Sequence, residues 1–186
     1  VVSGGTGYVG GWYPTATSVY ACYWTGTART DLDKETGHKE SAQAIAVYGA
    51  TVHCAGYQII TGSGDLEPCY WTGTTMTKLN RVEPYDAYAA AIHVEGTTVY
   101  TAGFYKNSDG VENACYWTGQ VMTPLESATA ADQGSRASAV KAAGATVYTG
   151  GYRQDGASYV PCTWTGTVRD DLDMGTSIQG FVTAIE

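Results

Sequence analysis

Four copies of one motif, each centred on a tryptophan, divide this chain into units of nearly equal length. The motif reads Cys-Tyr-Trp-Thr-Gly three times and Cys-Thr-Trp-Thr-Gly once, and its tryptophans are 47, 46 and 47 residues apart. A leucine follows each tryptophan by eight residues, and a Gly-aromatic pair precedes each motif. Such a period indicates four copies of one supersecondary unit. The positions that we assign to the repeated core are Trp24, Trp71, Trp117 and Trp164, Cys22, Cys69, Cys115 and Cys162, and Leu32, Leu79, Leu125 and Leu172.

Each unit contains four short segments with the composition of β-strands. The first two are typified by residues 44–47 and 51–57, the third by residues 21–24, and the fourth ends at the leucine. Short alternating runs separated by Gly, Asp and Asn are typical of hairpins, and the Asp-Gly pairs at 109–110 and 155–156 suit tips that need a positive φ. We therefore predict an all-β fold, a β-propeller of four-stranded antiparallel blades. A β-solenoid is the competing repeat fold, but its shorter, parallel coils need no hairpins within a unit.

The two ends of the chain read as two halves of one unit. The last residues followed by the first resemble residues 91–96 with one residue to spare, and the distance from Trp164 through both ends to Trp24 is again 46 residues. We predict that residues 178–186 and 1–20 pair as one blade, either within one chain or between chains that form a homo-oligomeric larger ring. The pattern favours a window on a longer array, or an engineered or self-assembling fragment. The chain is then one propeller domain or half of a larger ring, with units at about residues 1–43, 44–90, 91–138 and 139–186.

The repeat resembles that of bacterial β-propeller repeat proteins. Residues 91–105 carry the Ala-Ile-x-Val and Val-Tyr-x-Ala-Gly elements of that pattern, and residues 114–119 carry its Tyr-Trp strand. The resemblance covers the whole chain and implies propeller architecture and a secreted or cell-surface location, with no defined activity. An engineered chain would instead be cytoplasmic. Arrays of this kind usually run longer than four units, so the blade count of the closed ring stays open.

Charge and hydropathy exclude two classes of partner. The net charge is −8, and the ten basic residues are scattered singly, whereas a nucleic-acid-binding protein is expected to carry a basic stripe. No apolar run approaches the roughly 20 residues of a membrane-spanning helix. We therefore predict no nucleic-acid partner and no membrane insertion.

The five cysteines and three histidines are not spaced as a metal site. Four cysteines occupy one position in four different blades, beyond the roughly 7 Å limit between the Cα atoms of a disulfide, so we predict that all five are reduced thiols. No two cysteines or histidines stand at short ligand spacing. Residues 5–10 spell Gly-x-Gly-x-x-Gly, but a dinucleotide site needs a helix directly afterwards, and these residues align with the repeat. The sequence predicts no metal and no cofactor.

Residues that the repeat does not require are the better functional candidates. Exposed aromatic side chains at loop tips could stack on sugar rings or on another protein. The tyrosines that we select as candidate ligand-binding residues are Tyr13, Tyr20, Tyr85, Tyr88 and Tyr159.

Three functions remain open at this point. The first hypothesis is a non-enzymatic binding or interaction module, lectin-like in kind, with a glycan or protein ligand at its loop faces. The second is a structural, self-assembling or engineered repeat scaffold without a ligand. The third is a glycoside hydrolase-like enzyme that pairs loop carboxylates such as Asp86, Asp132 and Asp173. Because acidic loop residues are mostly solvated, we expect no enzymatic activity.

Overall fold

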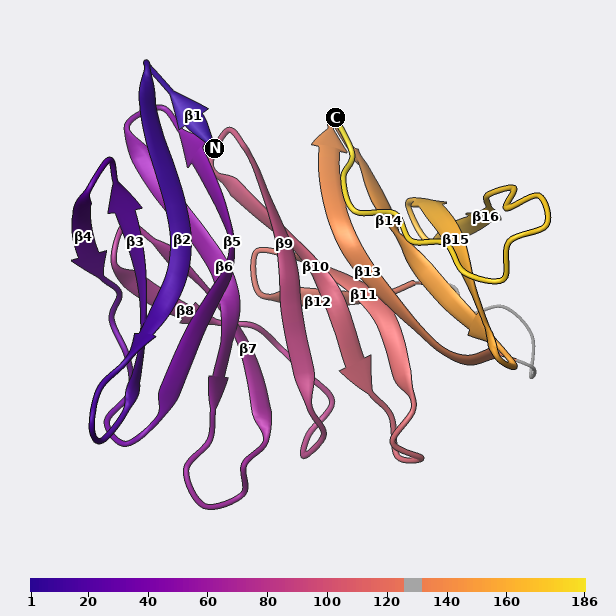
Figure 1. Cartoon of the computed structure of the whole chain (residues 1–186), viewed down its shortest axis with the longest axis horizontal. Helices are drawn as coiled ribbons and strands as arrows, with labels where there is room; N and C mark the ends of the chain where they lie inside the picture. Colours follow the sequence, from indigo (N-terminus) through magenta and orange to yellow (C-terminus); the bar gives the residue numbers. More distant parts are fainter. Residues whose placement is uncertain (126–131) are drawn as a thin grey trace.

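The computed structural model describes residues 1–125 and 132–186, and these residues form four antiparallel sheets of four strands each. Within each sheet the strands lie in chain order, and we call each sheet a blade (Figure 1). This arrangement confirms the predicted all-β fold of repeated four-stranded units. In the described part of the chain, no helix is long and apolar enough to cross a membrane.

The strand boundaries follow the repeat. The first blade contains β1 (Val2–Ser3), β2 (Thr6–Pro14), β3 (Val19–Thr25) and β4 (Ala28–Asp31). The second contains β5 (Lys39–Tyr48), β6 (Thr51–Ile59), β7 (Leu66–Thr72) and β8 (Thr75–Lys78). The third contains β9 (Ala87–Glu95), β10 (Thr98–Lys106), β11 (Glu112–Thr118) and β12 (Val121–Pro124). The fourth contains β13 (Asp132–Ala143), β14 (Thr146–Asp155), β15 (Ser158–Thr165) and β16 (Val168–Asp171).

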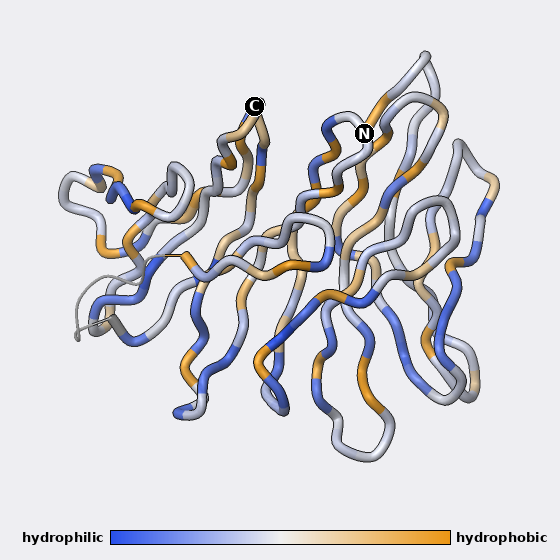
Figure 2. The backbone as a smooth tube through the Cα atoms, turned by 180° about the vertical axis from the view of Figure 1, so that it is seen from behind, coloured by the Kyte–Doolittle hydropathy of each residue, from blue (hydrophilic) through white to orange (hydrophobic). Residues whose placement is uncertain are grey.

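The inner strands are longer than the sequence predicts. Strand β5 begins at Lys39 rather than at residue 44, because a bulge between Ala42 and Ala44 lets the ladder continue past the bend in the strand. The predicted hairpin tips are confirmed, since Gly110 and Gly156 have φ values of 77° and 57°. Hydrophobic and hydrophilic residues alternate in short stretches along the blades (Figure 2), as expected for strands with two different faces.

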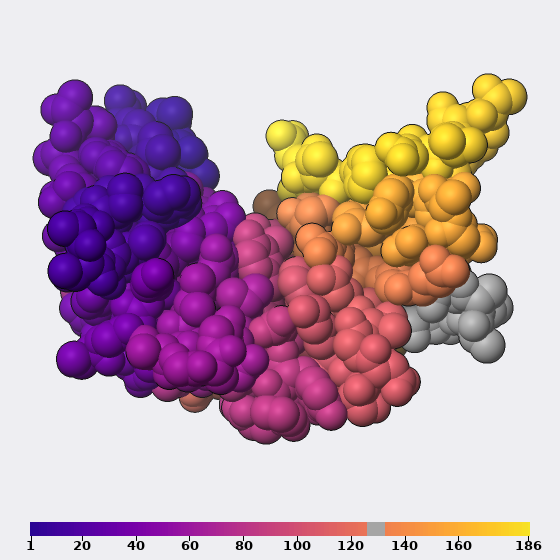
Figure 3. All heavy atoms as spheres, turned by 60° about the horizontal axis from the view of Figure 1, so that its bottom comes forward, coloured from indigo at the N-terminus to yellow at the C-terminus, as the bar shows by residue number. Residues whose placement is uncertain are grey.

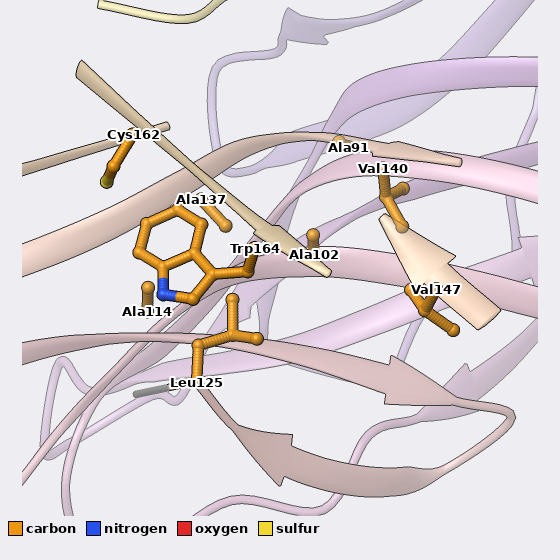
Figure 4. Close-up of a cluster of buried hydrophobic side chains, with 9 residues drawn as sticks. All are labelled: Ala91, Ala102, Ala114, Leu125, Ala137, Val140, Val147, Cys162 and Trp164. Carbon is orange, nitrogen blue, oxygen red and sulfur yellow. The ribbon is translucent and has the colours of Figure 1, made fainter. Parts of the chain in front are cut away.

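The core lies between successive blades, where the leucine of one blade contacts the tryptophan of the next. Leu125 packs with Trp164 and Ala137 (Figure 4). Leu32 packs in the same way with Trp71, and Leu79 with Trp117. The indole nitrogen of each of these two tryptophans also donates to the carbonyl oxygen just after the preceding leucine: Trp71 to Asp33 at 2.8 Å and Trp117 to Asn80 at 2.7 Å.

This core confirms most of the predicted positions and corrects two of them. Three of the tryptophans are completely buried, and Leu32, Leu79 and Leu125 are at most 5% exposed. Leu172, however, is 40% exposed, and Trp24 is only half-buried. The prediction that these two side chains lie in the core is wrong for the single chain. The reason is their place at the two ends of the array, where no further blade supplies the partner.

The four blades form an open arc. Packing runs from each blade to its neighbour in the chain, and an open notch separates the first blade from the fourth in the space-filling view (Figure 3). Residues 178–186 lie along the fourth blade, on the far side of this notch from β2 (Figure 1). The pairing of residues 178–186 with residues 1–20, within one chain or between chains, therefore stays a prediction.

Candidate functional site

The segment after β16 is held against the fourth blade by backbone hydrogen bonds. Tyr159 donates its amide to the Ile178 carbonyl at 3.1 Å and accepts from the Gly180 amide at 2.8 Å. Further on, the Val182 amide donates to the Gly151 carbonyl at 3.3 Å, and the Ser138 hydroxyl donates to the Val182 carbonyl. We call the segment 178–186 the tail. Its position is fixed against the fourth blade, on the face that points away from the third blade, which we call the outer face.

The aromatic contact made by the tail repeats a contact found between complete blades. In the second and third blades, the aromatic residue after the repeat glycine contacts the inner strand of the next blade: Tyr57 lies 4.9 Å from Tyr88, and Phe104 lies 4.6 Å from the Arg136 guanidinium. In the fourth blade the same residue is Tyr152, whose ring lies 5.1 Å from Phe181. Phe181 thus stands where Tyr88 and Arg136 stand in complete inner strands.

A second contact leads to the same assignment. A Cβ atom added to Gly10 of the first blade would meet Ile45 of the following inner strand at 3.3 Å. A Cβ atom added to the equivalent Gly150 would also meet the tail, with Val182 at 2.5 Å and Ile185 at 3.2 Å. The tail isoleucine therefore has the same relation to the fourth blade as Ile45 has to the first.

The tail also completes a row of small residues. One cavity of about 280 Å³ is lined by equivalent inner-strand positions of three blades and of the tail, and these are Ala44, Ala91, Ala139 and Ala184. The tail therefore occupies the place of the inner strand of a fifth blade, although it has no sheet to belong to within the described chain. The sequence signal for this placement is the alignment of residues 181–185 with residues 88–92.

The outer face of the fourth blade carries a groove next to the tail. This groove has a volume of about 400 Å³, and its lining includes Tyr148, Thr163 and Ile185. In the third blade, the residues equivalent to Tyr148 and Thr163 are Tyr100 and Tyr116, and both pack against the core cluster shared by the third and fourth blades. The groove is therefore the surface on which a following blade would pack.

The opposite end of the arc exposes the matching surface. Val9 is 59% exposed, whereas the residues at its position in the other blades (Cys54, Thr101 and Thr149) are completely buried. Trp24 is half-buried on the same first blade, without a leucine from a preceding blade. The first and last blades thus each expose residues whose equivalents are buried between neighbouring blades.

The five predicted tyrosines do not converge on one site. Tyr13 and Tyr20 stack on each other in the first blade with ring centroids 5.5 Å apart, and Arg29 and Lys34 lie over their rings at 3.8 Å. Tyr85 lies in the connection between the second and third blades. The other two have structural contacts: Tyr88 lies between Tyr57 and Phe104, and Tyr159 contacts Tyr152 and Phe181. The ligand-binding role of these residues stays a prediction.

The loop carboxylates have local structural partners. Asp86 accepts from the Leu66 amide at 2.7 Å and from the Lys106 ammonium group at 2.6 Å, so it ties the connection to two strands. Asp173 accepts from the Gly175 amide at 2.8 Å. Asp132 begins β13, and its side chain lies outside the described part. Asp86 lies in the connection between the second and third blades, Asp132 begins the fourth blade, and Asp173 follows it.

The sequence pattern does not predict an acidic cluster that lies on the second blade and on the connection before it. Gln58 donates its side-chain amide to Glu35 at 3.1 Å and also to Glu67, and the Lys78 ammonium group bridges these carboxylates at 2.8 and 2.9 Å. Glu40 lies opposite Gln58 in the ladder and is 1% exposed, yet neither of its carboxylate oxygens has a hydrogen-bond partner. The only sequence signal is a glutamate at a core position that other repeats fill with Ala87 and Ser135.

The burial of Glu40 predicts a pH-dependent stability. Burial raises the pKa of this carboxyl from 4.5 to about 7, while the charge of Lys34 lowers this pKa and that of Glu35 raises it. Because the pKa of the folded state exceeds that of the unfolded state, the stabilisation is complete below about pH 4.5 and is lost as the pH rises through 7. We expect the free energy of unfolding in urea to fall by up to about 3 kcal/mol between pH 5 and pH 8.

Glu40→Gln should remove most of this slope and stabilise the protein at pH 8, because the amide carries no charge to bury. Glu95→Gln, at an exposed position, is the control and should keep the slope of the parent. An unchanged slope in Glu40→Gln would show that another group is responsible.

The remaining motifs have structural roles. Cys22, Cys54, Cys69 and Cys115 are free, buried thiols, and Cys162 is buried as well. Burial raises the pKa of the Cys54 thiol to about 12. Residues 5–10 lie largely within strand β2, which excludes the strand-to-helix turn of a dinucleotide site. Among the described residues, no group of three or more His, Cys, Asp or Glu side chains is placed to hold a metal ion.

No protein-family model matches the chain, and no curated protein sequence matches it significantly. The two ends of the arc are therefore the features of the molecule that bear on its function.

Proposed function

We propose that this protein is a structural, self-assembling repeat scaffold, which closes a propeller ring by packing its fourth blade against the first blade of a second copy. The observation that carries the proposal is the tail, which already occupies the place of the next inner strand on the outer face of the fourth blade. An unfinished blade exposes strand edges and apolar side chains, and ring closure covers both.

The repeated interface supplies the contacts for this assembly. Inside the chain, each leucine packs on the tryptophan of the next blade, and two of these indoles donate to the carbonyl after the leucine. The unmatched members are Leu172 at one end and Trp24 at the other. In the proposed ring, Leu172 packs on Trp24 of the second copy, and the Trp24 indole donates to the carbonyl of Asp173.

The number of copies follows from the size of a propeller ring. Rings usually have about 4–8 blades, so copies of these four blades form a ring of one copy or of two. The first and fourth blades are separated by the open notch, which supports two chains (Figure 3). The two interfaces of such a ring are identical and join the head of one chain to the tail of the other.

Sedimentation equilibrium or native mass spectrometry tests the proposal. The parent protein should have twice the chain mass of 19.6 kDa. Leu172→Ala should weaken the dimer at least about 30-fold, since truncating a buried leucine costs about 2–5 kcal/mol and 1.4 kcal/mol is a factor of ten. Val168→Ala is the matched control, because Val168 is 60% exposed and its equivalent in the third blade, Val121, is 63% exposed, so neither belongs to the interface. A parent protein that stays at 19.6 kDa would contradict the proposal.

A further inference from the structure

The inner edge of β2 is an open strand edge in the described chain. Strand β1 pairs with β2 only through Val2 and Ser3, opposite Gly7 and Thr6. The other three blades have full inner strands of 9 to 12 residues on this side of the sheet. The backbone of β2 from Val9 to Pro14 therefore pairs with β3 on one side and lacks a ladder partner on the other.

A glycine in β2 indicates what this edge is shaped to receive. At the equivalent position of the other blades, Gly56, Gly103 and Gly151 lie beneath a bulged inner strand, and a Cβ atom there would be 1.8–1.9 Å from a carbonyl oxygen of that strand. These residues must be glycine because the backbone of the inner strand passes directly over them. The three carbonyl groups belong to Ser41, Tyr88 and Arg136.

Gly11 is the fourth member of this set, but among the described residues no backbone strand lies over it. A Cβ atom at Gly11 would approach only the end of the Trp24 ring, at 3.2 Å, and no backbone atom lies within 4 Å apart from its chain neighbours. A glycine inside a strand lowers stability by roughly 0.5–1 kcal/mol relative to alanine. Its presence is explained if a strand from outside the chain passes over it.

We infer that the edge of β2 binds the tail of a second copy as its inner strand, with the Phe181 carbonyl over Gly11. The register follows from the other blades: Phe181 pairs with Trp12, Val182 with Gly11, Ala184 with Gly10 and Ile185 with Val9, and the bulge falls at Thr183. This inference rests on the proposed function. It adds which strand pairs with β2, in which register, and that Gly11 leaves room for it.

The exposed side chains at the two segments agree with this pairing. Val9 and Trp12 are 59% and 52% exposed on one strand, and Phe181 is 51% exposed on the other. Pairing places Phe181 beside Trp12, as Tyr88 is paired with Phe104 and Arg136 with Tyr152. The tail of the same chain is already bound to its own fourth blade across the notch, so the strand that reaches β2 comes from the second copy (Figure 1).

The decisive variant is Gly11→Ala, compared with Gly7→Ala. The added methyl group at position 11 would meet the Phe181 carbonyl, so the dimer measured by sedimentation velocity should be weakened at least about 100-fold, the factor that corresponds to about 3 kcal/mol. Gly7→Ala adds the same methyl group where a Cβ atom meets nothing within 4 Å and where other blades carry valine, so its dimer should match the parent. Circular dichroism should show both variants folded.

A disulfide cross-link provides a second readout that does not depend on Gly11. A chain carrying Trp12→Cys and Phe181→Cys should, after mild oxidation, run as a covalent dimer on a denaturing gel, because directly paired strand residues are about 4.5–5.5 Å apart. Covalent dimers support the inference, whereas an oxidised monomer shows closure within one chain and overturns it. A Gly11→Ala protein that dimerises like the parent overturns the register while the proposed ring stands. A monomeric parent overturns the proposed function itself.

Discussion

Replacing Gly103 by alanine is expected to destabilise the protein by about 3 kcal/mol or more. The added Cβ atom would lie 1.8 Å from the Tyr88 carbonyl oxygen and 3.2 Å from the Ala89 Cα atom. Both contacts are with backbone, so no side-chain rotation relieves them, and β9 has to move away from β10. That movement breaks the ladder at the bulge and disturbs the Ala87 and Ala89 contacts around Trp117.

Urea unfolding followed by circular dichroism measures this loss, with Gly7→Ala as the control. Both substitutions add one methyl group to a strand glycine, but Gly7 has open space at its Cβ position. The control should be neutral or slightly stabilising, because alanine loses less backbone entropy on folding. If Gly103→Ala changed the free energy of unfolding by less than about 1 kcal/mol, the assigned bulge geometry would be incorrect.

Trp117→Ala is expected to cost about 3–5 kcal/mol, the usual range for a buried tryptophan. Trp117 is completely buried, and it packs with Leu79 and Cys115 between the second and third blades. The substitution also removes the indole donor and leaves the Asn80 carbonyl without its 2.7 Å hydrogen bond. The interface between these blades therefore loses both its largest apolar side chain and one polar contact.

Trp12→Ala is the matched control, since Trp12 is 52% exposed. Its loss should change the free energy of unfolding by less than about 1 kcal/mol in the monomeric state. The comparison uses the urea midpoint at low protein concentration, where assembly contributes least. Equal effects of the two substitutions would mean that the repeat tryptophans do not carry the interfaces between blades.

The repeat alone was sufficient to predict the blades and most of their core. Trp71, Leu79 and the Asp109-Gly110 turn were assigned correctly, because strand alternation, turn chemistry and a period of about 46 residues are properties of neighbouring positions in the chain. The bounds of the inner strands were less accurate, because bulges such as that between Ala42 and Ala44 depend on the partner strand. Local pattern therefore determines which strands form and in what order.

Only the tertiary structure decided which of the repeated positions are buried by a neighbouring blade. Leu172 and Leu79 are equivalent in the sequence, but only Leu79 has a following blade, so one is 40% exposed and the other 3%. Tyr88 is part of an aromatic stack, and Glu40 is buried without a partner, because of what the neighbouring blade places against them. Whether a side chain is buried, and whether its polar atoms have hydrogen-bond partners, depends on both of the surfaces that are in contact. A repeat pattern specifies each surface separately, and only the assembled arc determines which surfaces meet.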